Sequence, residues 1–173
     1  MTDTNPADPA TQAEFRKLMS LFATGVCVIS FDNRGGAGEP GISGMTVNSL
    51  VSVSLDPMLV CWSLQNSASQ YADYSQAEEF AISILADEQQ ALARRYAARG
   101  DAALIPEDFT RTARGLPVIA GALATIECRR WAVYPAGDHT MILGEVMAME
   151  VHAQEEHPRA LGFFNGHFRS IGL

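Results

Sequence analysis

Small polar side chains gather in one apolar, strand-like stretch of the sequence, Gly44–Pro57. Buried hydroxyl and amide groups need hydrogen-bond partners, which leaves two interpretations. Either the protein's own backbone satisfies them, or they bind the edge of a flat polar heterocycle, which needs donors and acceptors at fixed places. Composition alone slightly favours the first interpretation. The six side chains are Thr46, Asn48, Ser49, Ser52, Ser54 and Asp56.

A second polar segment, Asn66–Gln70, follows an expected strand and opens an expected short helix. Serine and asparagine at that place are ordinary helix N-caps. The same geometry binds phosphate, because the first helical turn has free N–H groups at the positive end of the helix dipole. Since every helix needs a cap, this segment alone is weak evidence for a phosphate site.

The third candidate is His139, which a Gly-Asp turn delivers to the head of a long expected strand. A lone histidine is more often a structural residue than a catalytic one. None of the four histidines is paired at metal-ligand spacing, and the sequence has no Cys-x-x-Cys motif. We therefore expect no metal site. We expect Cys27, Cys61 and Cys128 to be reduced and buried.

Strands dominate the elements that must position these groups. Runs rich in β-branched and aromatic residues predict most of them, and residues 50–55 alternate so that one face is hydroxyl-lined and the other apolar. Short turns and few helices then predict a mainly β fold, an antiparallel barrel with helices capping its ends. The expected strands cover residues 25–31, 41–47, 50–55, 58–63, 80–85, 123–133, 139–151 and 163–171.

Helices are expected in three places. Thr11 with Glu14 has the capping-box spacing, so the first helix should begin there, after a mobile arm over Met1–Ala10. Shorter helices are expected over residues 69–75 and 88–98, and residues 101–120 are expected to be irregular. We expect residues 11–173 to form a single domain. The apolar residues of the first helix recur at helical spacing, which predicts an inward-facing side made of Phe15, Leu18, Met19 and Phe22.

Composition bounds the function. The chain has 173 residues, of which 47% are hydrophobic, and its 12 basic and 20 acidic residues give a net charge of −8. Such a charge repels nucleic acid, and no basic patch overrides it. No apolar run approaches the roughly 20 residues of a membrane span. The first residues do not resemble a signal peptide. We therefore expect a soluble cytoplasmic protein with no nucleic-acid or membrane partner.

Taken in this order, the motifs resemble the flavin reductase-like family, the small reductase components of two-component flavin monooxygenases. The resemblance runs from about Phe15 to Phe168, nearly the whole chain. Its specific part is the serine-rich segment, followed about eighty residues later by a Gly-Asp-His motif. The matching motifs are Phe22–Val26, Gly44–Leu50, Ser52–Pro57, Phe80–Leu85, Gly115–Pro117, Gly137–His139, Gly144–Val146, Gly166 and Phe168.

The resemblance implies an FMN-binding split barrel, usually a homodimer with two flavin sites at the subunit interface. It implies an enzyme that transfers a hydride from NADH or NADPH to FMN or FAD and supplies diffusible reduced flavin to a separate oxygenase component. Two alternatives stay open, a flavoprotein that keeps its FMN for electron transfer and a non-catalytic flavin carrier. Because the flavin itself accepts the hydride, such a protein needs little acid–base chemistry of its own.

The resemblance also implies roles for individual residues. His139 is implied to sit beside the nicotinamide and the flavin ring, as the one catalytic residue. Ser67 and Ser69 are implied to hold the phosphate, with Arg95 adding positive charge near it. The remaining flavin-contacting positions are Thr46, Val47, Asn48, Ser49, Ser52, Val53 and Ser54 along the ring and ribityl chain, and Phe164 and Phe168 closing the pocket.

The sequence departs from the family pattern at three places. Met58 stands where a second proline is often found, and Gly162 stands where an aliphatic residue is common. The phosphate segment has no lysine or arginine close to it in the sequence. This last departure favours a flavin that binds loosely and acts as a substrate.

Overall fold

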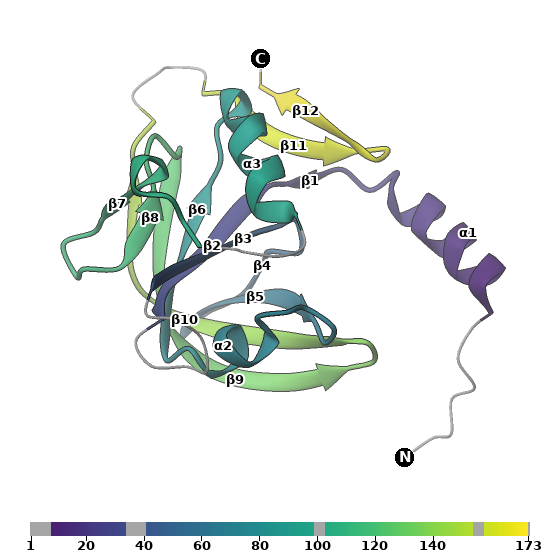
Figure 1. The fold of residues 1–173 in the computed structure, drawn as a ribbon, viewed down its shortest axis with the longest axis horizontal. Coiled ribbons are helices and arrows are strands. Elements are labelled where there is room, and N and C mark those ends of the chain that lie inside the picture. The colour runs from purple at the N-terminus through teal and green to yellow at the C-terminus, as the bar shows by residue number, and fades with distance from the viewer. Residues whose placement is uncertain (1–7, 34–40, 99–102, 154–157, 173) are drawn as a thin grey trace.

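One curled antiparallel sheet forms the body of the molecule in the computed structural model, which describes residues 8–33, 41–98, 103–153 and 158–172. Its strand order is β3-β2-β6-β9-β10-β5-β4 (Figure 1). The strands are β2 (Cys27–Asn33), β3 (Gly41–Val47), β4 (Val51–Leu55), β5 (Met58–Gln65), β6 (Glu79–Ile84), β9 (Ala124–Ala136) and β10 (His139–Val151).

The two edges of this sheet are β3 and β4, which follow one another in the chain. Within the described residues they are joined by the connection Asn48–Leu50 and not by a ladder of hydrogen bonds. The predicted mainly β, antiparallel fold is therefore confirmed, and the barrel is split along this line. The same line lies beside the polar segment Gly44–Pro57.

Two smaller sheets complete the strands. The pair β7 (Phe109–Arg111) and β8 (Pro117–Ile119) lies in the region predicted to be irregular, so that prediction is wrong there. The C-terminal strand predicted over residues 163–171 is a hairpin instead, because Asn165 and Gly166 adopt positive φ angles of 50° and 75° and reverse the chain. Its strands are β11 (Ala160–Phe164) and β12 (His167–Ile171), which form a sheet with β1 (Thr24–Gly25).

The helices are short and lie outside the sheet. The first begins at Pro9 and not after Thr11, because Asp8 is the N-cap: its Oδ1 accepts hydrogen bonds from the backbone N–H of Ala10 (2.9 Å) and Thr11 (3.1 Å). Residues 1–7 of the predicted arm lie outside the described residues. The helices are α1 (Pro9–Met19), α2 (Tyr71–Gln76) and α3 (Gln90–Ala97), with 3-10 turns η1 (Asp87–Gln89) and η2 (Pro106–Asp108).

The core lies on both sides of β2 and β6, in which consecutive side chains are buried. One cluster, inside the curl, packs Trp62 against Tyr74 and Phe80 with ring centroids 5.9 Å and 6.1 Å apart. The other lies under α3.

The three cysteines are free and buried, as predicted. Burial raises the pKa of the Cys27 and Cys128 thiols to about 12, so both stay protonated at neutral pH.

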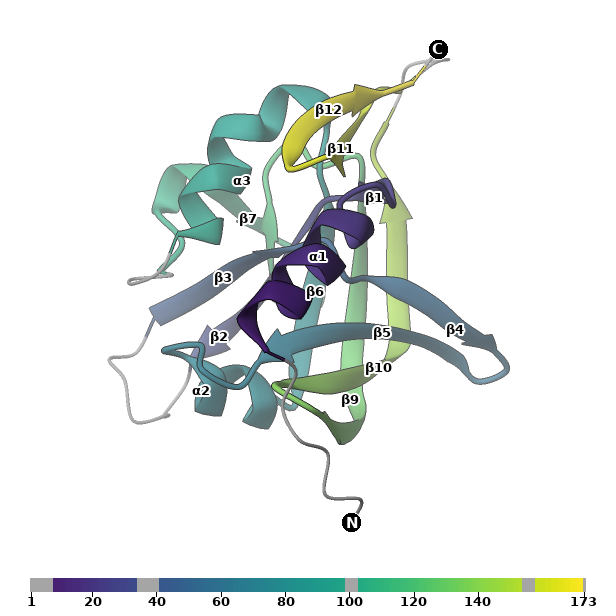
Figure 2. The ribbon, with the colours of Figure 1, turned by 90° about the vertical axis from the view of Figure 1, so that its right-hand side faces the viewer.

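The apolar side of α1 does not pack inward within this chain, so that prediction is wrong for the single subunit. Phe15, Leu18 and Met19 are exposed, and Phe22 just beyond the helix is 68% exposed. The helix stands away from the sheet in Figure 1 and crosses in front of it in Figure 2. Helical periodicity predicts that a side is apolar, but not what covers it.

Strand β4 shows the same behaviour. Its register with β5 shifts between Ser52 and Ser54, so the regular alternation predicted there stays a prediction, and its apolar side chains are exposed, Leu55 to 90%. As an edge strand, β4 is paired only with β5 in the described residues. Together with α1, it gives two apolar surfaces that no other described residue covers.

Candidate functional site

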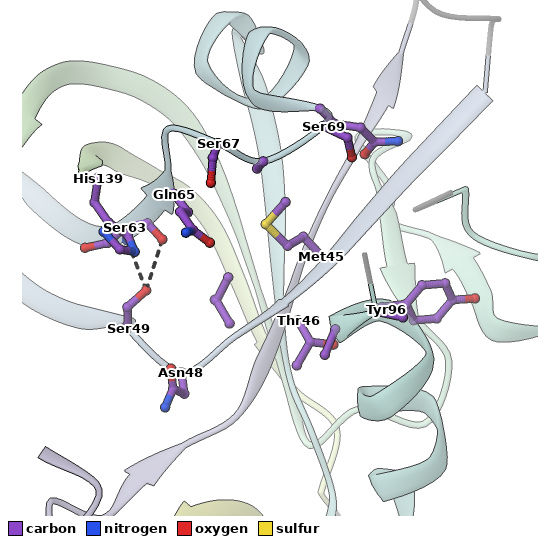
Figure 3. Close-up of a pocket in the computed structure, with 15 residues that line it drawn as sticks. Met45, Thr46, Asn48, Ser49, Ser63, Gln65, Ser67, Ser69, Tyr96 and His139 are labelled. Atoms are coloured by element: carbon purple, nitrogen blue, oxygen red, sulfur yellow. Dashed lines mark hydrogen bonds between the residues drawn. The ribbon is translucent and has the colours of Figure 1, made fainter. Parts of the chain in front are cut away.

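A pocket of about 500 Å³ opens beside the split in the sheet (Figure 3). The end of β3 and the connection after it form one wall, and the end of β5 with the turn after it forms another. The end of α3 and the first residue of β10 complete the lining. Its residues are Met45, Thr46, Val47, Asn48, Ser49, Ser63, Gln65, Ser67, Ala68, Ser69, Gln70, Tyr96, Ala97, Ala98 and His139.

The first wall carries four of the predicted residues, and the backbone satisfies two of them. Thr46 Oγ1 donates a hydrogen bond to the carbonyl of Ala93 on α3 (2.9 Å). Ser49 Oγ accepts one from the Ser63 N–H on β5 (3.0 Å). For these two hydroxyls, the interpretation that the protein's own backbone satisfies them is confirmed. Each hydrogen bond joins two segments of the pocket wall. Asn48 also lines the pocket and its side chain has no hydrogen bond within the described residues.

The turn from Gln65 to Gln70 forms the second wall. The expected helix begins at Tyr71 with Gln70 as its N-cap residue, so the helix-cap interpretation is wrong for Ser67 and Ser69, whereas their phosphate contacts stay predictions. The backbone turns through the Ala68 N–H, which donates to the carbonyl of Gln65 (3.0 Å). As a result, both serines are exposed and their hydroxyls point into the pocket (Figure 3). Neither hydroxyl has a hydrogen-bond partner in the described part of the chain.

His139 reaches the pocket from the turn between β9 and β10. Gly137 takes a φ of 67°, which lets the chain reverse there. The Nδ1–H of His139 donates to Asp138 Oδ1 (2.8 Å), and this hydrogen bond lowers the pKa of the Asp138 carboxyl. An ionised carboxylate only accepts, so it keeps the proton of the neutral imidazole on Nδ1. The second ring nitrogen, Nε2, is then an acceptor.

Two predicted groups lie outside the pocket in the single chain. Ser52, Val53 and Ser54 lie on β4, beyond the pocket lining. The guanidinium of Arg95 forms an ion pair with Asp108, and the Asp108 carboxylate balances its positive charge. The flavin contacts predicted for these residues stay predictions.

The aromatic residues of the C-terminal hairpin also lie outside the lining. Phe168 packs edge-on against Phe163, with ring centroids 5.5 Å apart, and the Arg94 guanidinium lies 4.9 Å from the centroid of its ring. Phe164 is exposed near the tip of the hairpin. Their role in closing the pocket is not tested by this arrangement and stays a prediction.

Sequence reasoning missed several lining residues. Ser63 lies at the end of the strand predicted over residues 58–63, and Gln65 lies two residues beyond it on the same face, so a strand prediction extended to Gln65 would have paired them. Gln70 was read only as part of a helix start. Tyr96 and the two residues after it also line the pocket, and no sequence pattern indicates this. Helix α3 lies beside β3 only because of the tertiary fold.

The pocket's chemistry fits a flavin. Its lining supplies hydroxyls, amides and one imidazole, and it contains no lysine or arginine. Gln70 Oε1 is buried without a hydrogen-bond partner in the described residues, which is costly unless a bound group supplies a donor. A flavin ring offers such a donor at its polar edge, and its phosphate can accept from Ser67 and Ser69.

Other kinds of site are not seen in the described ranges. Across residues 8–33, 41–98, 103–153 and 158–172, no three His, Cys, Asp or Glu side chains gather in a way that could hold a metal ion. Among the described helices, none combines the length and the apolar character needed to cross a membrane.

Comparison with known proteins points to the same chemistry. An FMN reductase (NADH) from Agrobacterium fabrum is 44% identical over 133 residues, which cover 77% of this chain and 73% of that protein. The NADH:FAD oxidoreductase of Streptomyces globisporus, solved with NAD and FAD fragments, superposes with a TM-score of 0.82 at 32% identity, covering 97% of each chain.

A third similar protein is the styrene monooxygenase flavin reductase of Pseudomonas putida S12. It superposes with a TM-score of 0.80 at 33% identity, covering 92% of this chain and 98% of that one. Finally, the family model described as "Flavin reductase like domain" matches residues 19–172, nearly the whole chain. This chain therefore belongs to the flavin reductase-like family, as its motifs predicted.

Proposed function

We propose that this chain is an NADH-dependent flavin reductase that transfers a hydride to FMN or FAD. The observation that carries the proposal is the pocket itself, because Ser67, Ser69 and His139 line the same cavity. Relatives at 44% and 32% identity are named as an NADH-dependent FMN reductase and an NADH:FAD oxidoreductase. The same family and the same kind of lining support the same reaction here.

A bound flavin supplies the electron-accepting ring, so the residues of the chain act by binding and orientation. Ser67 and Ser69 donate hydrogen bonds to the phosphate, and Asn48 and Gln70 bind the polar edge of the ring. His139, held by Asp138, orients the nicotinamide beside it. By orienting the nicotinamide toward the flavin and excluding water, these residues would accelerate the transfer without a protein acid or base.

The flavin is a substrate that the protein releases. The pocket lining has no cation, and the nearby Arg95 is engaged by Asp108. Phosphate binding then depends on neutral donors, whose hydrogen bonds are weaker than those of an arginine or a lysine. A similar structure is named as the flavin reductase of a styrene monooxygenase. We propose that reduced flavin leaves this chain for a separate oxygenase component in the same way.

The assay measures NADH oxidation by the purified protein, with and without added FMN. The proposal predicts oxidation that saturates as free FMN increases. Oxidation that is independent of added flavin would indicate a tightly held FMN and an electron-transfer protein. Absence of oxidation with either NADH or NADPH, in a protein that still binds FMN, would indicate a flavin carrier. Either result overturns the proposal of a released substrate.

We also propose that the protein is a homodimer. The apolar side of α1 and the exposed residues of β4 are surfaces that the described part of the chain leaves uncovered. A second copy of the chain can cover both, since a stable interface buries roughly 800 Å² per partner and is more apolar than the rest of the surface. Light scattering that gives the mass of a monomer at micromolar concentration would contradict this. The cytoplasmic location predicted from the sequence remains a prediction.

A further inference from the structure

Asn66 joins the two turns that flank the pocket. Its backbone N–H donates to the carbonyl of Asp138 (3.0 Å), and its side-chain Nδ2 donates to the carbonyl of Gly137 (3.2 Å). Its Oδ1 accepts a hydrogen bond from Thr140 Oγ1 (2.8 Å). Three hydrogen bonds therefore hold the Gly137–Thr140 turn, which carries His139, against the residue that precedes Ser67.

A further hydrogen bond extends this network to α2. Tyr71 OH and Thr140 Oγ1 are 2.8 Å apart. Because Thr140 has one hydroxyl proton and gives it to Asn66, Tyr71 is the donor in this contact. Thr140, at the centre of this network, is buried, whereas Tyr71 is half-buried and Asn66 is exposed. The network thus fixes both ends of the turn that contains Ser67 and Ser69.

This arrangement connects two binding functions that lie far apart in the sequence. Ser67 follows Asn66 directly and faces the phosphate side of the pocket. His139 lies between Asp138 and Thr140, and both of these residues bond to Asn66. A hydrogen-bonded pair within one element would position one group only, whereas Asn66 touches both sides of the pocket at once.

We propose that Asn66 is a positioning residue that couples the phosphate-binding serines to His139. The inference rests on the proposed flavin reductase function and deepens it. Asn66 itself does not line the pocket; it sets where the nicotinamide side stands relative to the flavin side. Its loss changes the handling of both substrates, although it contacts neither of them.

Two substitutions test the coupling. Asn66→Ala removes the side-chain donor and acceptor, and we expect it to lower kcat/KM for NADH by about 10-fold and to raise the Kd for FMN by a similar factor. Thr140→Val keeps the volume of the side chain and removes its hydroxyl, and we expect changes of the same kind. Thr140→Ser restores the hydroxyl, so it should recover most of both losses.

Controls separate positioning from stability. Gln76→Ala, at the far end of α2 and outside the network, should leave kcat/KM and the Kd for FMN unchanged. A purely structural role for Asn66 predicts a lower Tm, with KM for NADH and the Kd for FMN of the folded protein unchanged. That outcome, or a change in FMN affinity alone, overturns the proposal.

A measurement without turnover keeps the test separate from the proposed function. FMN binding to the wild-type protein should slow amide hydrogen exchange in the turn around His139, and Asn66→Ala should abolish this slowing. If the wild-type protein oxidises no NADH, the proposed function fails while this coupling is still measured. If FMN slows exchange equally in both proteins, the coupling through Asn66 is wrong whatever the activity.

Discussion

The hydroxyls of Ser67 and Ser69 give a sharp test of which part of the flavin each wall of the pocket binds. Both hydroxyls face the pocket and have no hydrogen-bond partner in the described part of the chain. A hydrogen bond to a charged group contributes about 1.5–3 kcal/mol, and 1.4 kcal/mol is tenfold in affinity. Since both side chains are exposed to solvent, the lower value applies, so Ser67→Ala and Ser69→Ala should each raise the Kd for FMN by about 10-fold.

Riboflavin distinguishes the phosphate from the ring. It presents the same ring and ribityl chain without the phosphate, so its Kd should be the same for the wild-type protein and both variants. Quenching of flavin fluorescence measures both affinities on one sample. The substitutions break no hydrogen bond within the described chain, so Tm should be unchanged. Ser75→Ala on α2 is the matched control, because its hydroxyl bonds to the Ala72 carbonyl and not toward the pocket.

Two outcomes refute this assignment. Equal weakening of FMN and riboflavin would place these hydroxyls on the ring or the ribityl chain. Unchanged affinity for both ligands would show that the serines bind no part of the flavin. In either case the phosphate would have to lie elsewhere in the pocket.

Three further predictions follow from the site, the core and the surface. His139→Ala should lower kcat for NADH oxidation by about 10-fold or more with the Kd for FMN nearly unchanged, and steady-state kinetics showing unaltered turnover would remove the role given to it. The raised pKa of Cys27 and Cys128 means that these thiols stay protonated when folded and ionise above pH 9 when unfolded. The free energy of unfolding should therefore fall as pH rises from about 9 toward 12 in denaturant titrations, and a pH-independent value would contradict the burial. Leu18→Asp and Phe22→Asp should each weaken the proposed homodimer by at least about 10-fold in light scattering, since burying such a side chain contributes about 1.5–3 kcal/mol, and unchanged association would place the interface elsewhere.

Local patterns predicted the elements that depend on local chemistry. The long strands β9 and β10 were expected from their β-branched and aromatic content and are confirmed. The signal for the C-terminal hairpin is the Asn165-Gly166 pair, which lies between aromatic residues that by themselves favour one continuous strand. At the first helix, a capping-box spacing at Thr11 competed with Asp8 followed by proline, and the second arrangement forms because proline is well placed at the first helical position.

Contacts between distant segments could not be read from the sequence. Asn66 bonds to Gly137 and Thr140, which lie 71 and 74 positions along the chain, so nothing in its own segment indicated its role. The apolar side of α1 was recognised correctly as apolar, but periodicity does not specify whether the covering surface belongs to the same chain. The family resemblance predicted the flavin and the nicotinamide hydride donor, and the structure shows which residues line one pocket.

Flavin reduction is tested most directly by NADH oxidation by the purified wild-type protein as free FMN is titrated. We predict a rate that is close to zero without added FMN, rises with its concentration and then saturates. A rate that stays close to zero at all FMN concentrations, in a protein whose fluorescence titration shows that FMN binds, would contradict it.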